Sequence, residues 1–430
     1  MTLFEKRPER PVPALGMALF LVTWQMASGS LLDAGQPKIP VAADAGGNRP
    51  NVIVVLTDDQ GWGDLSVHGN GNLSTPNIDR LASQGASFER FFVCPVCSPT
   101  RAEFLTGRYH SRMGVYSTSA GGERMNLDEV TIADTFRAAG YVTGAFGKWG
   151  LGGPESSGRP LNQGVDRFFG YNCQAHAHSY YPSYLWDDEK HFGLDNNPPV
   201  PGHASLAKGA NPLDPKSYDP FKGTDYAPDR IHEQALKFIR DHQDEPFFLY
   251  YPTVIPHVAL HVPDEDLKPY WDLGWKDPPF TRGSGYGYTP HFTPRAAYAA
   301  MITRLDRYVG NVLRTLDELG LADNTLVVFS SDNGTTHLGE EVDYDFFKSV
   351  GELRGLKGSL YEGGVRVPTL VRWPGRVAAG SSSDYVSGFE DWMPTLLDAV
   401  GASGATPSTI DGVSILPALL GKRLAERSYL

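Results

Sequence analysis

The chain has 430 residues, of which 41% are hydrophobic and 20% are charged, so it can bury a large core in one or two domains. Its formal net charge of −12 argues against nucleic acid as a partner, because a phosphate backbone needs a basic surface. The chain has only three cysteines, Cys94, Cys97 and Cys173. A fold that depends on disulfides would normally have more cysteines and an even number of them.

The N-terminus has the layout of a secretory signal peptide. Basic residues within the first ten positions precede an apolar stretch over 14–26, and small residues follow. This stretch is shorter than the roughly 20 apolar residues of a membrane-spanning helix. We therefore predict a signal peptide over 1–29, a linker over 30–49, and a secreted or periplasmic protein without a stable membrane anchor.

Apolar strands alternate with helices along the rest of the chain. Strands are predicted at 51–57, 141–146, 247–251 and 325–330, and helices at 75–85, 98–107, 131–139, 228–242 and 295–319. This alternation predicts an α/β fold in which helices cover a large, mostly parallel central sheet. Two long segments, 171–225 and 260–294, show no clear periodicity and are rich in aromatic residues, Pro and Gly. Irregular segments of this length are usually functional, so we expect loops on the substrate side.

Two of these strands, far apart in sequence, end in pairs of oxygen ligands. Asp58 and Asp59 follow the first strand, and Asp332 and Asn333 follow the last. Functional groups of parallel sheets gather at the carboxyl ends of the strands, so the four side chains should meet. Carboxylate and amide oxygens suit Ca²⁺ or Mg²⁺ better than zinc, and three carboxylates without a cation would repel one another. A lone aspartate would be better explained as a cap or turn residue, but two pairs predict a metal site.

A short motif next to the predicted second helix carries a family resemblance. The segment 97–101, CSPTR, followed by LTGR at 105–108, resembles the signature of the type I sulfatases of the alkaline-phosphatase superfamily. The resemblance extends from Pro50 to about Arg427. Further segments match the family in the usual order: DDQGWGD at 58–64, TPNIDRL at 75–81, GY through GKW at 140–149, PH at 256–257, SDNG at 331–334, and Lys357 ahead of YEGG at 361–364.

The resemblance implies a sulfuric ester hydrolase whose nucleophile is made after translation. In this family a maturation enzyme oxidises the signature cysteine to formylglycine, so Cys97 would be the precursor. The family has a three-layer α/β/α sandwich, which we expect over 50–421. The resemblance also implies that Ca²⁺, with Mg²⁺ as the alternative, is held by Asp58, Asp59, Asp332, Asn333 and the modified Cys97.

Four further residues match catalytic positions of the family. Arg101 would hydrogen-bond the formylglycine hydrate, and Lys148 and Lys357 would contact the sulfate oxygens. His257 would bind near the leaving oxygen and help to protonate it. A helix start at Cys97 would itself favour an anion, because free backbone N–H groups and the positive end of the helix dipole lie there. For an isolated lysine or arginine, a solvated surface position would be the ordinary explanation.

Two features depart from the family pattern. Many members have a histidine two residues after the signature lysine, where this chain has Gly150. His337 either supplies the missing imidazole or is an ordinary loop histidine. Members usually continue past the last residues of this chain, so 422–430 are expected to begin a truncated, otherwise missing, small C-terminal sheet subdomain. His178, among aromatic residues, is the remaining candidate for substrate binding.

We therefore predict a sulfatase that acts on a small-molecule or saccharide sulfate ester, with a carbohydrate favoured by the aromatic loops and the predicted secretion. A phosphodiesterase or phosphonate monoester hydrolase of the same superfamily would share the fold, the metal ligands and even the formylglycine. A catalytically impaired secreted binding protein would also fit Gly150 and the early end of the chain.

Overall fold

The computed structural model describes residues 49–118, 124–153, 155–282 and 287–427. They belong to a single structural unit, which spans Ile39–Leu430. The predicted signal peptide and almost all of the predicted linker lie outside the described residues. Within the described part of the chain, no helix has both the length and the apolarity that crossing a membrane requires.

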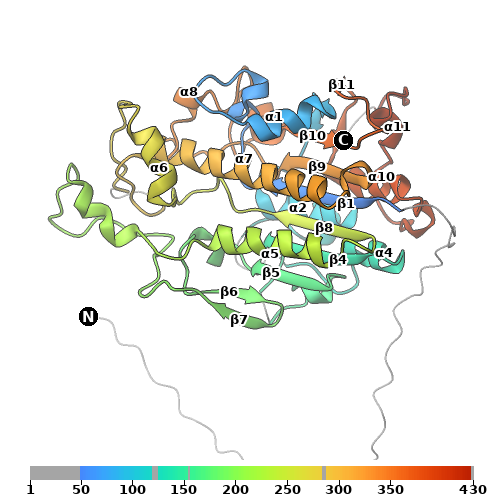
Figure 1. The fold of residues 1–430 in the computed structure, drawn as a ribbon, viewed down its shortest axis with the longest axis horizontal. Helices are drawn as coiled ribbons and strands as arrows, with labels where there is room; N and C mark the ends of the chain where they lie inside the picture. Colours follow the sequence, from blue (N-terminus) through green and yellow to red (C-terminus); the bar gives the residue numbers. More distant parts are fainter. Residues whose placement is uncertain (1–48, 119–123, 154, 283–286, 428–430) are drawn as a thin grey trace, which may run out of the picture. The chain divides into compact units, whose positions relative to one another are not determined.

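A ten-stranded sheet forms the centre of the fold, in the order β11-β2-β10-β9-β1-β8-β4-β5-β6-β7 (Figure 1). Its five central strands are parallel to one another. They are β9 (Thr325–Ser331), β1 (Asn51–Thr57), β8 (Phe247–Pro252), β4 (Val142–Lys148) and β5 (Arg167–Tyr171). The four predicted strands are therefore confirmed to within two residues, and β5 is added to them.

The short strands at the two edges of the sheet include antiparallel pairings, although β11 pairs parallel with β2. One edge holds β10 (Thr369–Arg372), antiparallel to β9, then β2 (Ala86–Phe88) and β11 (Ser381–Ser383). The other edge holds the antiparallel strands β6 (Tyr184–Asp187) and β7 (Lys190–Gly193). A separate pair is formed by β3 (Phe91–Phe92) and β12 (Ser387–Gly388). Segment 171–225 therefore contains two strands despite its lack of periodicity, because strands of four residues are too short to show one.

Helices cover both faces of the sheet (Figure 1). One face packs against α1 (Pro76–Ser83), α5 (Ala227–Asp241) and α7 (Pro294–Glu318), and the other against α2 (Cys97–Thr106), α4 (Ile132–Ala138) and α10 (Trp392–Ala399). The shorter helices are α3 (His110–Met113), α6 (Asp264–Trp271), α8 (Tyr344–Phe347), α9 (Glu362–Val365) and α11 (Leu416–Leu419). The predicted α/β/α sandwich is confirmed.

The burial of the central strand β1 explains why residues 52–56 are all apolar. Ile53 and Val55 lie in the core under α5 and α7. Val52, Val54 and Leu56 lie in the core on the opposite face. A strand that is covered on both faces has no solvent-facing positions, so polar residues are excluded until the strand ends.

Helix α2 is buried along its whole length. Its polar side chains therefore need partners inside the protein, because an unpaired buried polar group is costly. Cys97 is the first residue of this helix, one position earlier than the sequence predicts. The chain thus places a thiol and an arginine, Arg101, in the interior beside the ends of the central strands.

Candidate active site

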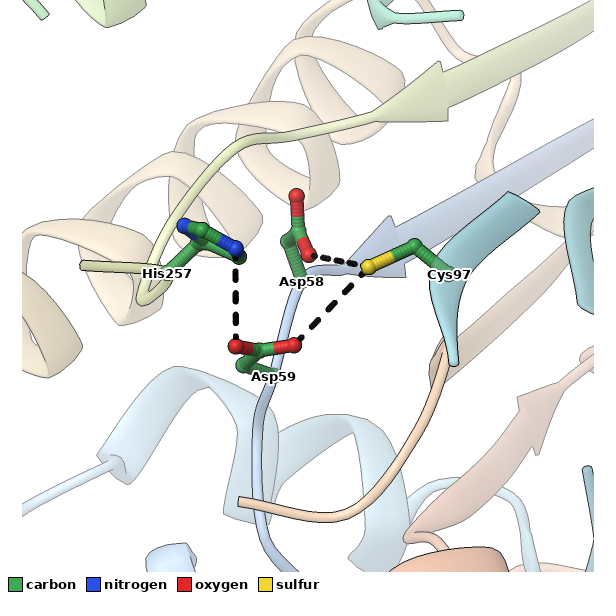
Figure 2. A group of neighbouring side chains, drawn as sticks. All are labelled: Asp58, Asp59, Cys97 and His257. Atoms are coloured by element: carbon green, nitrogen blue, oxygen red, sulfur yellow. Dashed lines mark hydrogen bonds and ion pairs between the residues drawn. The ribbon is translucent and has the colours of Figure 1, made fainter. Parts of the chain in front are cut away.

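The carboxyl ends of four parallel strands and the start of α2 meet at one place. Asp58 and Asp59 follow β1, Asp332 and Asn333 follow β9, Lys148 ends β4, and His257 lies in the loop after β8. Figure 2 shows the side chains of Asp58, Asp59, Cys97 and His257 turned toward one another. Segments that are far apart in sequence thus build a single cluster, as strand-end positions in a parallel sheet predict.

Cys97 lies at the centre of this cluster and is 1% exposed. Its Sγ is 3.4 Å from Oδ1 of Asp58 and 4.0 Å from Oδ1 of Asp59. The Nζ atoms of Lys357 and Lys148 lie 3.3 Å and 3.9 Å from the same sulfur. Two carboxylates and two ammonium groups therefore surround the thiol. Any group attached at position 97 is in contact with both negatively and positively charged side chains.

The charges in the cluster are paired. Lys148 Nζ donates to Asp58 Oδ2 at 2.6 Å, and Lys357 Nζ donates to Asp59 Oδ1 at 2.6 Å. The guanidinium of Arg101 binds Oδ2 of Asp332 through Nε and Nη2, at 3.0 Å and 2.7 Å, and also donates to the carbonyl oxygen of Lys148. These bonds satisfy a buried arginine and fix three strand ends against α2.

Asp59 has a backbone conformation that few residues adopt. Its φ is +62°, which aspartate tolerates better than most side chains. In this conformation its backbone N–H donates to Oδ1 of Asp332 at 3.1 Å, and its own Oδ1 accepts from Nδ2 of Asn333 at 2.7 Å. The turn after β1 thereby fastens to the turn after β9.

The oxygen atoms of this cluster fit a hard divalent cation. Oδ2 of Asp59 and Oδ1 of Asn333 are buried and have no hydrogen-bond partner among the described residues. Each would leave a costly unpaired oxygen unless a cation met it. Together with Asp58 and Asp332 they provide carboxylate and amide oxygens, the donors that Ca²⁺ and Mg²⁺ prefer.

Burial and neighbouring charges act in opposite directions on the pKa values here. Burial alone would raise the pKa of Asp58, but the positive charges around it, led by Lys148, together outweigh burial and hold that pKa far below its usual range. Burial and the negative charge of Asp58 raise the pKa of Asp332 to about 6. Burial, followed by the charge of Asp332, raises the pKa of the Cys97 thiol well above its ordinary value. An unmodified thiol at this position therefore stays protonated near neutral pH.

A group of aromatic side chains stands against the cluster. The rings of His257 and His178 are stacked, with centroids 5.4 Å apart and an interplanar angle of 7°. Tyr288 meets both rings edge-on, at 5.4 Å and 5.0 Å, and His203 Nε2 lies 2.9 Å from Nδ1 of His178. His257 contacts the acidic cluster itself, with Nε2 3.6 Å from Oδ2 of Asp59. Burial lowers the pKa of His257 to about 4 and that of His178 to about 2, so both rings are neutral at neutral pH.

Gln174 fills the space beside Gly150. Gly150 has a φ of +72°, and a Cβ added there would lie 2.6 Å from Nε2 of Gln174. This buried amide donates to Oγ of Ser98 at 2.6 Å, and the Ser98 hydroxyl donates to the carbonyl oxygen of Gly150 at 2.7 Å. The sequence interpretation missed Gln174, although its place just after β5, at the carboxyl end of the sheet, is a usable signal.

His337 is placed differently from the other predicted site residues. It is exposed, and it is not among the side chains that contact Cys97 in the described part of the chain. All the other predicted residues, including His178, lie in the cluster or against it. The structure thus brings together Asp58, Asp59, Cys97, Arg101, Lys148, His257, Asp332, Asn333 and Lys357.

Comparisons with known proteins identify the family of this chain. Residues 50–402 match the family model described as Sulfatase. The chain is 34% identical to human (Homo sapiens) arylsulfatase A over 415 residues, covering 92% of this chain and 73% of that protein. It is 32% identical to human N-acetylgalactosamine-6-sulfatase, covering 88% and 67% of the two chains. Among solved structures, Ps i-CgsB in complex with k-i-k-neocarrahexaose is similar, with 27% identity, a TM-score of 0.68, and 87% and 76% of the chains covered.

The family model covers most of the described chain, and both relatives exceed 30% identity over most of their own length. The chain therefore belongs to the sulfatase family and is an enzyme that hydrolyses sulfate esters.

Proposed function

We propose that this enzyme removes sulfate from a carbohydrate sulfate ester, with formylglycine derived from Cys97 as its nucleophile and Ca²⁺ as its metal ion. One observation carries the proposal: Cys97 Sγ lies within 4.0 Å of two carboxylates and two lysines. The lysines can bind a tetrahedral anion such as sulfate, and the carboxylates can hold a cation beside the nucleophile that attacks it.

Formylglycine at position 97 would supply a hydrated aldehyde, whose hydroxyl is a stronger nucleophile than a buried, protonated thiol. A divalent cation held by Asp58, Asp59, Asp332 and Asn333 would supply Lewis acidity beside it. The unpaired oxygens of Asp59 and Asn333 support this ligand set.

The remaining groups have separate tasks. Lys148 and Lys357 flank position 97 and are placed to neutralise sulfate oxygens as charge builds on them. Arg101 holds Asp332 and the end of β4, so it positions the ligands. The Nδ1 atom of His257 donates to the carbonyl oxygen of Val258. That bond leaves Nε2 facing the site. To protonate the leaving oxygen, Nε2 would first take up a proton from solvent, which the negative charge of a bound sulfate favours.

Four observations support a carbohydrate substrate. One similar relative is named an N-acetylgalactosamine-6-sulfatase, and one similar structure holds a neocarrahexaose. In this chain the rings of His178 and Tyr288 stand beside His257, and such rings suit stacking against a sugar. The signal-peptide layout of the N-terminus supports export from the cytoplasm. An exported enzyme would meet extracellular polysaccharides.

The experiment has two parts. Mass spectrometry of the peptide that contains Cys97, from protein made together with a formylglycine-generating enzyme, is expected to show the aldehyde in place of the thiol. The same protein is then assayed with an aryl sulfate, a set of sulfated saccharides and an aryl phosphate diester. Sulfate release should dominate, and Cys97→Ala should lower it by more than about 1,000-fold. Faster turnover of the diester would instead favour a phosphodiesterase or phosphonate hydrolase.

A further inference from the structure

A second group of metal-binding side chains lies outside the proposed catalytic cluster. Cys94 precedes α2, Glu103 lies near the end of α2, and His110 begins α3. Nδ1 of His110 is 3.2 Å from Sγ of Cys94 and 2.8 Å from Oε1 of Glu103. One ligand atom from each of the three residues lies within 4.8 Å of the other two. Their donor atoms therefore already converge on a volume the size of one ion.

The arrangement does not fit a catalytic triad in which a histidine activates a cysteine nucleophile. In a relay of cysteine, histidine and carboxylate, the thiol and the carboxylate contact opposite nitrogens of the imidazole ring, so that one proton can pass through it. Here Cys94 and Glu103 both approach Nδ1 of His110. A single ring nitrogen cannot act as a base toward the thiol while it donates to the carboxylate.

The surroundings of this group hold buried carboxyl groups with too few cations to pair them all. Glu103, Glu390 and Asp391 are 6%, 3% and 0% exposed. Arg427 pairs with Asp391, but it comes no closer to Oε1 of Glu390 than 3.7 Å. That oxygen is buried and has no hydrogen-bond partner among the described residues. A bound divalent cation would offset this imbalance.

The pKa values reflect the same imbalance. Burial, with the charges of Asp391 and Glu103, raises the pKa of Glu390 to about 8. Burial, with the charges of Glu103 and Glu390, raises the pKa of the Cys94 thiol well above its ordinary value. Glu390 therefore interacts electrostatically with both Glu103 and Cys94, and the short helical turn that carries it, Phe389–Asp391, packs against α2.

We propose that Cys94, Glu103 and His110 bind a zinc ion. A thiolate, an imidazole and a carboxylate are the ligands that zinc prefers, whereas Asp58, Asp59, Asp332 and Asn333 offer oxygens alone. On binding, the Cys94 thiol releases its proton to solvent. The His110 side chain is 33% exposed, which gives the ion a route into the site.

Zinc at this site would join the segment before α2 to the residues after it. Cys94 lies three positions before Cys97, and His110 lies four positions after the end of α2 at Thr106. The ion would therefore cross-link the two ends of α2, the helix that carries the proposed nucleophile. The proposal is independent of the reaction at Cys97, because it concerns different ligands and a different metal.

The test uses Co²⁺ as a spectroscopic substitute for zinc in the full-length protein. Metal-free protein is titrated with Co²⁺ in the presence of excess Ca²⁺, which keeps hard-ligand sites filled. We expect a thiolate-to-cobalt charge-transfer band and tetrahedral d–d bands that saturate at one equivalent of Co²⁺. Zinc should abolish both signals at one equivalent, and elemental analysis should find the same amount of zinc in protein purified without a chelator.

The variants assign these bands to one thiol. Cys94→Ser and His110→Ala should lose the charge-transfer signal, whereas Cys173→Ser and Cys97→Ser should keep it. No thiolate band in the wild-type protein would overturn the proposal. A band that persists in Cys94→Ser but disappears in Cys97→Ser would overturn it too, because the ion would then sit in the catalytic cluster. If Cys94→Ser fails to fold, the double variant Cys97→Ser/Cys173→Ser decides, because Cys94 is then the remaining thiol: a retained band supports the proposal and a lost band overturns it.

Discussion

The side-chain amide of Gln174 donates a hydrogen bond of 2.6 Å to Oγ of Ser98, the residue that follows Cys97. Ser98 in turn donates to the carbonyl oxygen of Gly150 at 2.7 Å. The start of α2 is thereby tied to the segment after β4 and to the segment after β5. The space where many relatives are expected to carry a histidine is filled in this chain by an amide from another loop.

The first prediction concerns this tie. Gln174→Ala removes the donor and opens a cavity beside Ser98, so the start of α2 loses one of its positional constraints. We expect kcat to fall by about 10-fold, because small displacements of a reacting group are costly, while KM changes little. Steady-state kinetics on an aryl sulfate would measure this. A matched control is Gln163→Ala, a buried glutamine that binds backbone carbonyls elsewhere, which should lower stability without changing kcat.

The second prediction concerns Asp58. Asp58→Ala leaves the buried ammonium of Lys148 without its 2.6 Å partner, and breaking such a pair typically costs about 3–5 kcal/mol of folding stability. It also removes a proposed metal ligand. We expect Ca²⁺ to raise the melting temperature of the wild-type protein, and we expect this variant to lose both that rise and its turnover.

Asp306→Ala is the control for that experiment. Asp306 is buried and accepts hydrogen bonds from Asn77 and from the backbone at the start of α1, away from the cluster. This variant should be destabilised yet keep the Ca²⁺-dependent shift. If Asp58→Ala also kept the shift, Asp58 would not be a metal ligand.

The third prediction concerns His337. The structure leaves this residue exposed, so we expect that it does not take the place of the histidine missing at Gly150. His337→Ala should retain kcat within about twofold, because exposed side chains outside a site contribute little. A rate reduced by 10-fold or more would show that the loop brings this imidazole to the substrate during turnover.

The fourth prediction is a pH dependence of stability at Glu341. This residue is 2% exposed, and burial raises its pKa to about 7 from an unfolded value of 4.5. Between about pH 4.5 and pH 7, the Glu341 carboxyl therefore keeps its proton in the folded state and releases it in the unfolded state. The resulting stabilisation is complete below about pH 4.5, is lost as pH rises toward 7, and stays lost above it.

Glu341→Gln cannot ionise and can still accept from the backbone N–H of Tyr288. Relative to the wild-type protein, its free energy of unfolding should rise by up to the order of 3 kcal/mol between pH 4.5 and pH 8. Denaturant titrations at several pH values would measure this. Parallel pH curves for the two proteins would mean that Glu341 has an ordinary pKa in the folded state.

Much of the fold was predictable because its central elements carry local signals. The strands β1 and β9 are continuous apolar runs that end in acidic residues, and α7 is long enough to show its helical periodicity. The strands β6 and β7 were not predictable, because four residues at a sheet edge carry no repeating pattern. The helix start at Cys97 was predicted one residue late, which is the ordinary uncertainty of a helix end.

The sequence by itself determined the family, the sheet architecture and the motif residues that meet at the strand ends, because strand order and strand ends follow from patterns along the chain. Only the tertiary structure decided what stands between the motifs. It put Gln174 rather than His337 beside Gly150, set His178 and Tyr288 against His257, and gathered Cys94, Glu103 and His110 around one point. These are contacts between loops and helix ends, and their distances depend on how packed layers meet, which no local pattern encodes.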